Sequence, residues 1–118
     1  MGSERADKIT GLQGSSARMA MLSAGNAMIE IFQYSLHTSK GGDCRRSVCD
    51  HGITHICLEV VGIDTEYERL KKMGMEFHCP PQDFGTGIKA TYGRDPDGNV
   101  IELQEISNDD HPMALKAR

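Results

Sequence analysis

The chain repeats a short phrase in which a Gly-Asn pair is followed by an apolar run containing one glutamate. Residues 25–31 read GNAMIEI, and residues 98–103 read GNVIEL. Glycine and asparagine are typical of tight turns, and the runs that follow favour β-strands. A carboxylate inside an apolar strand is costly unless another group neutralises it. The repeat therefore predicts a duplicated fold whose equivalent strands bring Glu30 and Glu102 to a shared site.

Length and charge limit the classes of partner. A chain of 118 residues is most simply one domain. Its net charge of −4 gives no electrostatic footprint for nucleic acid or an anionic membrane. No apolar run approaches the roughly 20 residues that span a bilayer, and the N-terminus lacks the apolar segment of a signal peptide. We expect a cytoplasmic protein with no nucleic-acid or membrane partner.

The first half of the chain predicts a hairpin between two irregular segments. We expect a turn-rich lead-in over 1–17, a β-hairpin over 18–35 and a polar linker over 36–51. Alternation in the return strand places Glu30 on the same face as Phe32. Glu30 therefore points with aromatic residues.

The second half predicts one complete strand-helix-strand module over 52–107, followed by a tail over 108–118. The order is a strand, a helix that begins at Asp64 or Thr65 and ends at Gly74, and then three strands. The expected strands are 53–61, 75–79, 87–93 and 100–106, with a loop at 82–86. The fold class is therefore α+β, with a βαβββ module.

This pattern resembles one family. The segments that carry the resemblance are ITHI at residues 53–56, RDPDGNVIEL at 94–103, and the hairpin at 19–34. They resemble the vicinal oxygen chelate superfamily, which includes glyoxalases, bleomycin resistance proteins and extradiol dioxygenases. The resemblance implies two βαβββ modules around a cleft that holds a divalent metal ion.

The resemblance also implies which residues hold the ion. By position, the metal ligands are Glu30, His55 and Glu102, with Glu102 as the first choice of catalytic base and Glu30 as the second. Imidazole and carboxylate ligands suit Ni²⁺, Zn²⁺, Co²⁺, Mn²⁺ or Fe²⁺. His55 alone is more often a structural histidine, and each glutamate alone a solvent-facing acid.

The sequence departs from the family pattern at its beginning. A first module opens with its own strand, which usually carries another ligand histidine, but no histidine precedes His37. We therefore expect a partial, truncated first module that contributes only the hairpin. An unpaired strand edge favours pairing with a second copy, so we expect a homodimer.

Three functions are compatible with this pattern. The first is a metal-dependent lyase or isomerase, like a glyoxalase or an epimerase, in which a small-molecule substrate chelates the ion through adjacent oxygens and a glutamate moves a proton. The second is a metal-free module of the resistance type that binds a small apolar molecule. The third is an extradiol-type dioxygenase, which ranks lower because iron in such sites prefers two histidines and one carboxylate.

Overall fold

The computed structural model describes residues 4–115, which belong to two compact units that divide between Gly42 and Asp43. We call residues 4–42 the hairpin unit and residues 43–115 the module unit. The division falls inside the segment predicted as a linker. Helices and strands both occur, so the α+β class is confirmed. No helix within residues 4–115 is long and apolar enough to cross a bilayer.

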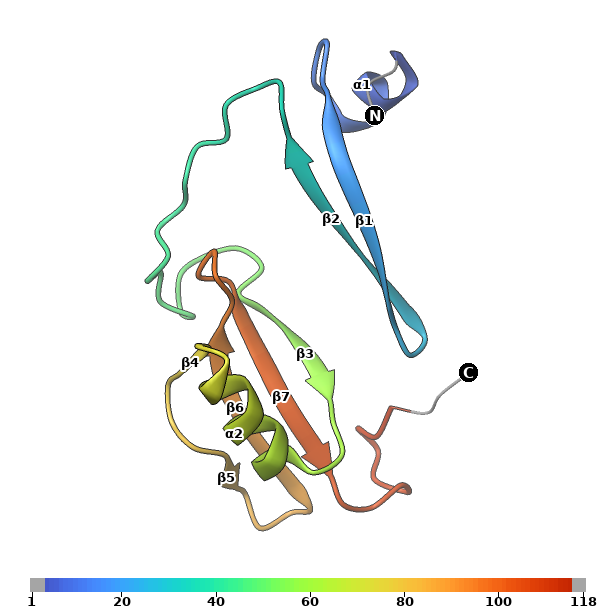
Figure 1. Ribbon diagram of the computed structural model, residues 1–118. Coiled ribbons are helices and arrows are strands. Elements are labelled where there is room, and N and C mark those ends of the chain that lie inside the picture. Colours follow the sequence, from blue (N-terminus) through green and yellow to red (C-terminus); the bar gives the residue numbers. More distant parts are fainter. Residues whose placement is uncertain (1–3, 116–118) are drawn as a thin grey trace. The chain divides into compact units, whose positions relative to one another are not determined.

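The hairpin unit consists of a short helix and two antiparallel strands (Figure 1). They are α1 (Glu4–Thr10), β1 (Ala17–Ala24) and β2 (Ala27–Tyr34). Ala24 pairs with Ala27 across a tight turn in which Gly25 has φ +62°. That conformation favours glycine, and the hairpin covers residues 17–34, where 18–35 was predicted.

The helix α1 was not predicted, because its surroundings are rich in glycine and serine. The helix is held by contacts with residues further along the chain. The Asp7 carboxylate accepts hydrogen bonds from the backbone N–H groups of Gly14 and Ser15, and from the Ser15 hydroxyl. These bonds, chiefly those from Ser15, lower the pKa of Asp7. The glycine-rich segment is therefore folded back onto the helix rather than free.

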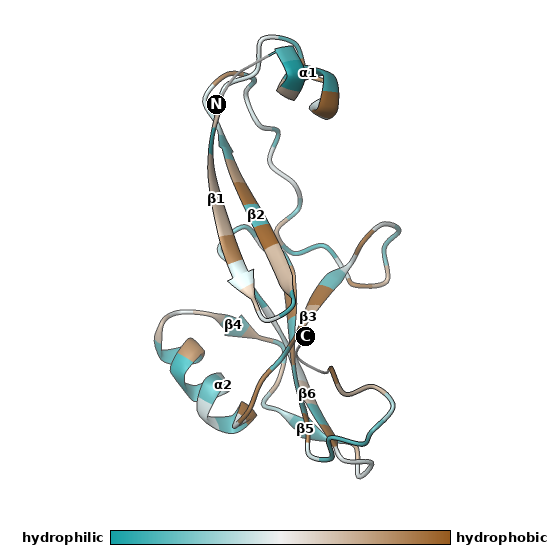
Figure 2. Cartoon of the chain, turned by 90° about the vertical axis from the view of Figure 1, so that its right-hand side faces the viewer, coloured by the Kyte–Doolittle hydropathy of each residue, from teal (hydrophilic) through white to brown (hydrophobic). Residues whose placement is uncertain are grey.

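The large apolar side chains of the hairpin unit are mostly exposed within that unit. Met28 and Ile31 are 59% and 52% exposed, and Phe32 is 40% exposed. Figure 2 shows the corresponding hydrophobic bands on β2. A sheet of two strands has no second layer to pack against, so it cannot bury both of its faces.

The module unit contains a five-stranded sheet and one helix (Figure 1). Its elements are β3 (His55–Glu59), α2 (Ile63–Lys72), β4 (Glu76–Phe77), β5 (Gln82–Asp83), β6 (Ile88–Arg94) and β7 (Val100–Ile106). The strand order is β3-β7-β6-β4, and β5 pairs with β6. β3 runs parallel to β7, and the other pairs are antiparallel. The predicted βαβββ order is observed, and the short β5 lies in the segment expected to be a loop.

The helix α2 covers one face of this sheet (Figure 1). Ile63 is completely buried, and Leu103 of β7 is 3% exposed. The Tyr67 ring meets Phe77 edge-on, with centroids 4.8 Å apart. Burying these side chains between α2 and the sheet stabilises the module unit.

The start of α2 differs from the prediction. The helix begins at Ile63 after Gly62, which has φ +77° and makes no side-chain cap, so the predicted cap at Asp64 or Thr65 is wrong. The Glu105 carboxylate of β7 instead accepts the Gly62 N–H. Since this acceptor comes from a strand far along the chain, local sequence could not reveal it. The predicted end is confirmed, because Gly74 follows the helix with φ +100°.

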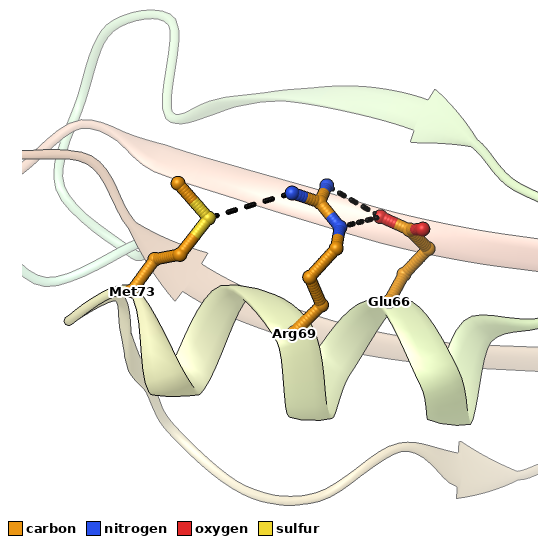
Figure 3. A network of polar contacts seen from close by, with 3 residues as sticks. All are labelled: Glu66, Arg69 and Met73. Atoms are coloured by element: carbon orange, nitrogen blue, oxygen red, sulfur yellow. Dashed lines mark hydrogen bonds and ion pairs between the residues drawn. The ribbon is translucent and has the colours of Figure 1, made fainter.

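The outer surface of α2 carries a small polar network, shown in Figure 3. Arg69 donates to the Glu66 carboxylate from Nε at 3.1 Å and from Nη2 at 2.6 Å. Its Nη1 also lies 3.5 Å from the Met73 sulfur. The network joins successive turns of the helix and takes no part in the site described next.

Candidate functional site

The sheet face opposite α2 brings together four side chains of the module unit. In register, Glu102 of β7 pairs with Cys57 of β3 and with Tyr92 of β6. Paired residues of neighbouring strands point to the same face, and so do residues two apart on one strand. His55 therefore joins Cys57, Glu102 and Tyr92 on this face.

The centre of this group is the imidazole of His55. Its Nε2 lies 3.2 Å from Oε2 of Glu102 and 3.2 Å from the hydroxyl of Tyr92. Its Nδ1 lies 2.9 Å from the Thr54 hydroxyl. The side chains of His55 and Glu102 are only 29% and 17% exposed. The predicted pairing of His55 with Glu102 is thus observed, at hydrogen-bonding distance.

The contact between His55 and Glu102 is suited to a cation. When Nδ1 donates its proton to Thr54, Nε2 presents a lone pair toward a carboxylate oxygen, which also carries lone pairs. Two such acceptors at 3.2 Å attract each other only with a positive charge or a proton between them. The arrangement therefore either shares a proton or holds a metal ion.

Two neighbours of the pair keep their protons at neutral pH. Burial, followed by the charge of Glu102, raises the pKa of the Cys57 thiol to about 11. Burial and then Glu102 also raise the pKa of the Tyr92 hydroxyl. Both side chains therefore act there as neutral groups.

The donor atoms fit a divalent ion in part. Imidazole nitrogen and carboxylate oxygen bind Zn²⁺ at about 2.0–2.2 Å, so two adjacent ligands of one ion lie roughly 3 Å apart. The separation of 3.2 Å between His55 and Glu102 meets this requirement. Thr54 supplies the kind of outer contact that orients a ligand histidine. Among residues 4–115, however, no three histidine, cysteine or acidic side chains are gathered into a complete set of ligands.

The third predicted ligand, Glu30, lies on β2 in the hairpin unit. It pairs with Met21 of β1, and its side chain is exposed. Within residues 4–115 its carboxylate makes no hydrogen bond or ion pair. Its role as a ligand beside His55 and Glu102 stays a prediction.

Sequence reasoning missed the contacts of Thr54 and Tyr92 with His55. The signal for Tyr92 was present, because the turn at Asp95–Asn99 centres a hairpin in which Tyr92 must oppose Glu102. The signal for His55 was weaker. Its place beside β7 depends on a parallel strand pairing, which no local pattern reveals.

Comparison with known proteins identifies a family for this chain. The model of the Glyoxalase/Bleomycin resistance protein/Dioxygenase superfamily matches residues 1–103. No curated protein matches the chain significantly.

Solved structures of this superfamily share the fold. A glyoxalase family protein from Bacillus cereus is 24% identical with a TM-score of 0.81, over 89% of this chain and 72% of that chain. One from Enterococcus faecalis is 26% identical with a TM-score of 0.54, over 87% and 89% of the two chains. A genomically encoded fosfomycin resistance protein from Listeria monocytogenes is 18% identical with a TM-score of 0.52, over 86% and 81%. Proteins with this fold carry different functional descriptions, so the fold alone does not determine the activity. The activity must be argued from the residues of the site.

Proposed function

Because the chain belongs to the glyoxalase/bleomycin resistance protein/dioxygenase superfamily, we propose that it is a metal-dependent lyase or isomerase of the glyoxalase or epimerase kind. The observation that carries the proposal is the contact of 3.2 Å between His55 Nε2 and Glu102 Oε2 on a partly buried sheet face. In this proposal Glu30 is the third ligand, and the ion is Ni²⁺, Zn²⁺, Co²⁺, Mn²⁺ or Fe²⁺. A homodimer is part of the same proposal.

The residues of the site have separate roles in this chemistry. A divalent ion held by His55, Glu102 and Glu30 would supply a Lewis acid for a small substrate with adjacent oxygens, which would make the neighbouring C–H more acidic. Thr54 orients the His55 ring so that Nε2 is free to bind. Glu102 takes the proton, since Cys57 and Tyr92 hold theirs at neutral pH. Glu30 is the second candidate for this proton transfer.

Metal binding is the first test. We expect the purified protein to bind about one equivalent of a divalent ion, measured by calorimetry with Mn²⁺ and Zn²⁺. Glu102→Gln should weaken binding by more than the roughly 10–100-fold that loss of an outer contact costs. Glu68→Gln is the matched control, because Glu68 is an exposed acid on α2, behind the sheet. Equal binding by all three proteins would contradict the proposal.

Proton transfer is the second test. We expect the metal-loaded protein to exchange the C–H protons of hydroxyacetone for deuterium in D₂O, measured by NMR. Glu102→Gln should abolish this exchange. Exchange that persists in Glu102→Gln and disappears in Glu30→Gln would reverse the order of the two glutamates.

One observation favours a second candidate, the metal-free binding module. Behind the sheet, a cavity of about 970 Å³ lies between the end of α2 and the strands, and Leu70, Met75 and Phe77 are among its lining residues. This volume is within the range of small-molecule pockets. A protein that takes up no metal but binds a fluorescent apolar probe, displaced by other apolar compounds, would favour this candidate. Oxygen uptake with catechol would favour the dioxygenase instead.

A further inference from the structure

The cavity of about 970 Å³ lies on the helix side of the sheet, away from His55 and Glu102. Leu58 and Leu103 are among its lining residues. Each follows directly after a residue of the opposite face, Cys57 and Glu102 respectively. Because successive residues of a strand point to opposite faces, the cavity and the proposed metal site occupy different sides of the sheet. A ligand in the cavity is therefore independent of an ion on the other face.

Much of the cavity wall is apolar. The large apolar side chains in it come from both strands and helix, and include Leu58, Leu70, Met75, Phe77 and Leu103. Leu103 is buried, and the other four are half-buried. Removing such apolar surface from water is favourable, so a hydrocarbon group that covers these side chains gains binding free energy. This part of the cavity is suited to the apolar portion of a ligand.

Two arginines line the same cavity, Arg45 and Arg94. Arg94 donates from Nη1 to the Gly98 carbonyl at 3.0 Å and from Nη2 to the Arg46 carbonyl at 2.9 Å. These acceptors are uncharged, and a guanidinium has five N–H donors, so Arg94 keeps its charge and further donors for a ligand. The Arg45 side chain makes no hydrogen bond or ion pair with any residue of 4–115.

Two acids also line the cavity, but neither neutralises the arginines. Both carboxylate oxygens of Asp95 accept hydrogen bonds within its own turn, from the backbone N–H groups of Asp97 and Asn99 and from the Asn99 side chain. Glu76 is exposed on the edge strand β4. Among residues 4–115, neither acid forms an ion pair with an arginine. Solvent screens exposed Glu76 more than half-buried Arg94, so the cavity favours an anion over a cation.

We propose that this cavity binds an apolar carboxylate, whose hydrocarbon part covers the apolar wall and whose charged end pairs with Arg45 and Arg94. A guanidinium matches a carboxylate through two parallel hydrogen bonds, which an alcohol or an amine does not form. The proposal goes beyond the proposed function, because the ion belongs to the other face of the sheet. It also gives the second candidate a definite class of ligand.

The test is a titration of the ¹⁵N-labelled full chain with decanoate, followed by amide NMR. We expect the signals of Gly74 and Gly98, which line the cavity, to shift, and that of Gly25 in the hairpin unit to stay in place. Decanol has the same chain without the charge and should bind about tenfold more weakly, with decylamine weaker still. Hexanoate should also bind more weakly than decanoate, by about fourfold for each CH₂ group that is no longer buried.

Arg45→Gln tests the charge directly, because Arg45 is exposed and its side chain makes no contact within residues 4–115 that the folded protein would lose. It should weaken decanoate binding by about two- to fivefold and leave decanol binding unchanged. Arg18→Gln is the matched control. It makes the same substitution at an exposed position of β1, in the hairpin unit, and should change neither affinity. The amide spectrum of each variant shows whether the fold is intact.

The outcomes separate this inference from the proposed function. Equal affinities for decanoate and decanol, or equal affinities of Arg45→Gln and Arg18→Gln for decanoate, would overturn the carboxylate site. Shifts confined to β1 and β2 would overturn it as well, because decanoate would then be bound only by the exposed hairpin. Decanoate binding by a protein that takes up no metal would leave this inference standing and overturn the proposed function. Metal uptake without decanoate binding would do the reverse.

Discussion

The two strands that carry the repeated phrase, β2 and β7, have very different neighbours. Among residues 4–115, β2 pairs only with β1, and most of the residues of β2 are exposed. β7 lies between β3 and β6, and Val100 and Leu103 are 4% and 3% exposed. Glu30 is exposed on the first strand, whereas Glu102 is 17% exposed on the second and lies beside a histidine.

The comparison separates local from tertiary effects. Both copies of the phrase form the same local structure, a glycine with positive φ followed by a strand. The chemistry of the glutamate differs, because neighbouring strands supply the histidine and the low exposure. The phrase therefore determines a strand with an acid, and the sheet around it determines what the acid can do.

The largest expected effect compares one apolar side chain from each unit. Ile63→Ala removes a completely buried side chain of the module unit and should lower the free energy of unfolding by about 2–5 kcal/mol. Ile31→Ala removes a side chain that is 52% exposed and should cost no more than about 0.5 kcal/mol. Urea denaturation followed by circular dichroism measures both. Similar losses from the two variants would show that the hairpin face is covered in solution, and would break the comparison.

The next effect compares the glycines of the two Gly-Asn turns. Gly25 and Gly98 both have positive φ, so alanine at either position is strained by about 1–2 kcal/mol. A Cβ at Gly25 meets open space, whereas one at Gly98 would collide with the backbone of Cys44. Gly98→Ala should therefore lower the free energy of unfolding by about 1–3 kcal/mol more than Gly25→Ala does, because the new methyl group overpacks the site. Equal costs in thermal denaturation would show that the segment around Cys44 moves aside freely.

A third effect tests how β7 changes the chemistry of its neighbour β3. Because burial and Glu102 raise the pKa of Cys57 from 9.0 to about 11, its thiolate fraction at pH 8 should be at least about tenfold below that of an ordinary thiol. Iodoacetamide labelling followed by mass spectrometry should show Cys57 reacting more slowly than Cys49, although both residues are exposed. Glu102→Gln should increase the labelling rate of Cys57 and leave that of Cys49 unchanged. Equal rates for the two cysteines in the unmodified protein would contradict this.

The same shift has a consequence for stability. The folded protein holds the Cys57 proton more tightly than the unfolded chain does. The contribution of this proton to the free energy of unfolding is therefore fully present below pH 9. It is lost as the pH rises from 9 toward 11. Cys57→Ser should flatten this part of the stability profile.

The smallest effect lies on the solvent face of α2. The hydrogen bond from Arg69 lowers the pKa of Glu66. The stabilisation that ionised Glu66 gives the folded protein is therefore present above the ordinary pKa of 4.5 and is lost as the pH falls below it. Glu66→Gln should lower the melting temperature only slightly at pH 7, because exposed ion pairs contribute little. Glu68→Gln is the control, and a larger loss from Glu68→Gln would contradict the role of the network.

Turns and alternation predicted much of the fold. The Gly-Asn turns located β2 and β7, and Gly74 located the end of α2. Each of these signals is a local preference of the backbone, which is why it can be read from adjacent residues. The helix α1 and the start of α2 were not predicted. They depend on Asp7 reaching Ser15 and on Glu105 reaching Gly62, which are contacts between distant positions.

The sequence by itself determined the fold class, the family and the candidate residues His55 and Glu102. The tertiary structure decided that these two side chains meet, since a parallel pairing of β3 with β7 places them 3.2 Å apart although they are far separated along the chain. It also decided that Thr54 and Tyr92 contact the two ring nitrogens of His55. The physical reason is that residue preferences act over a few positions, whereas the neighbours of a side chain are chosen by how whole strands pair and pack.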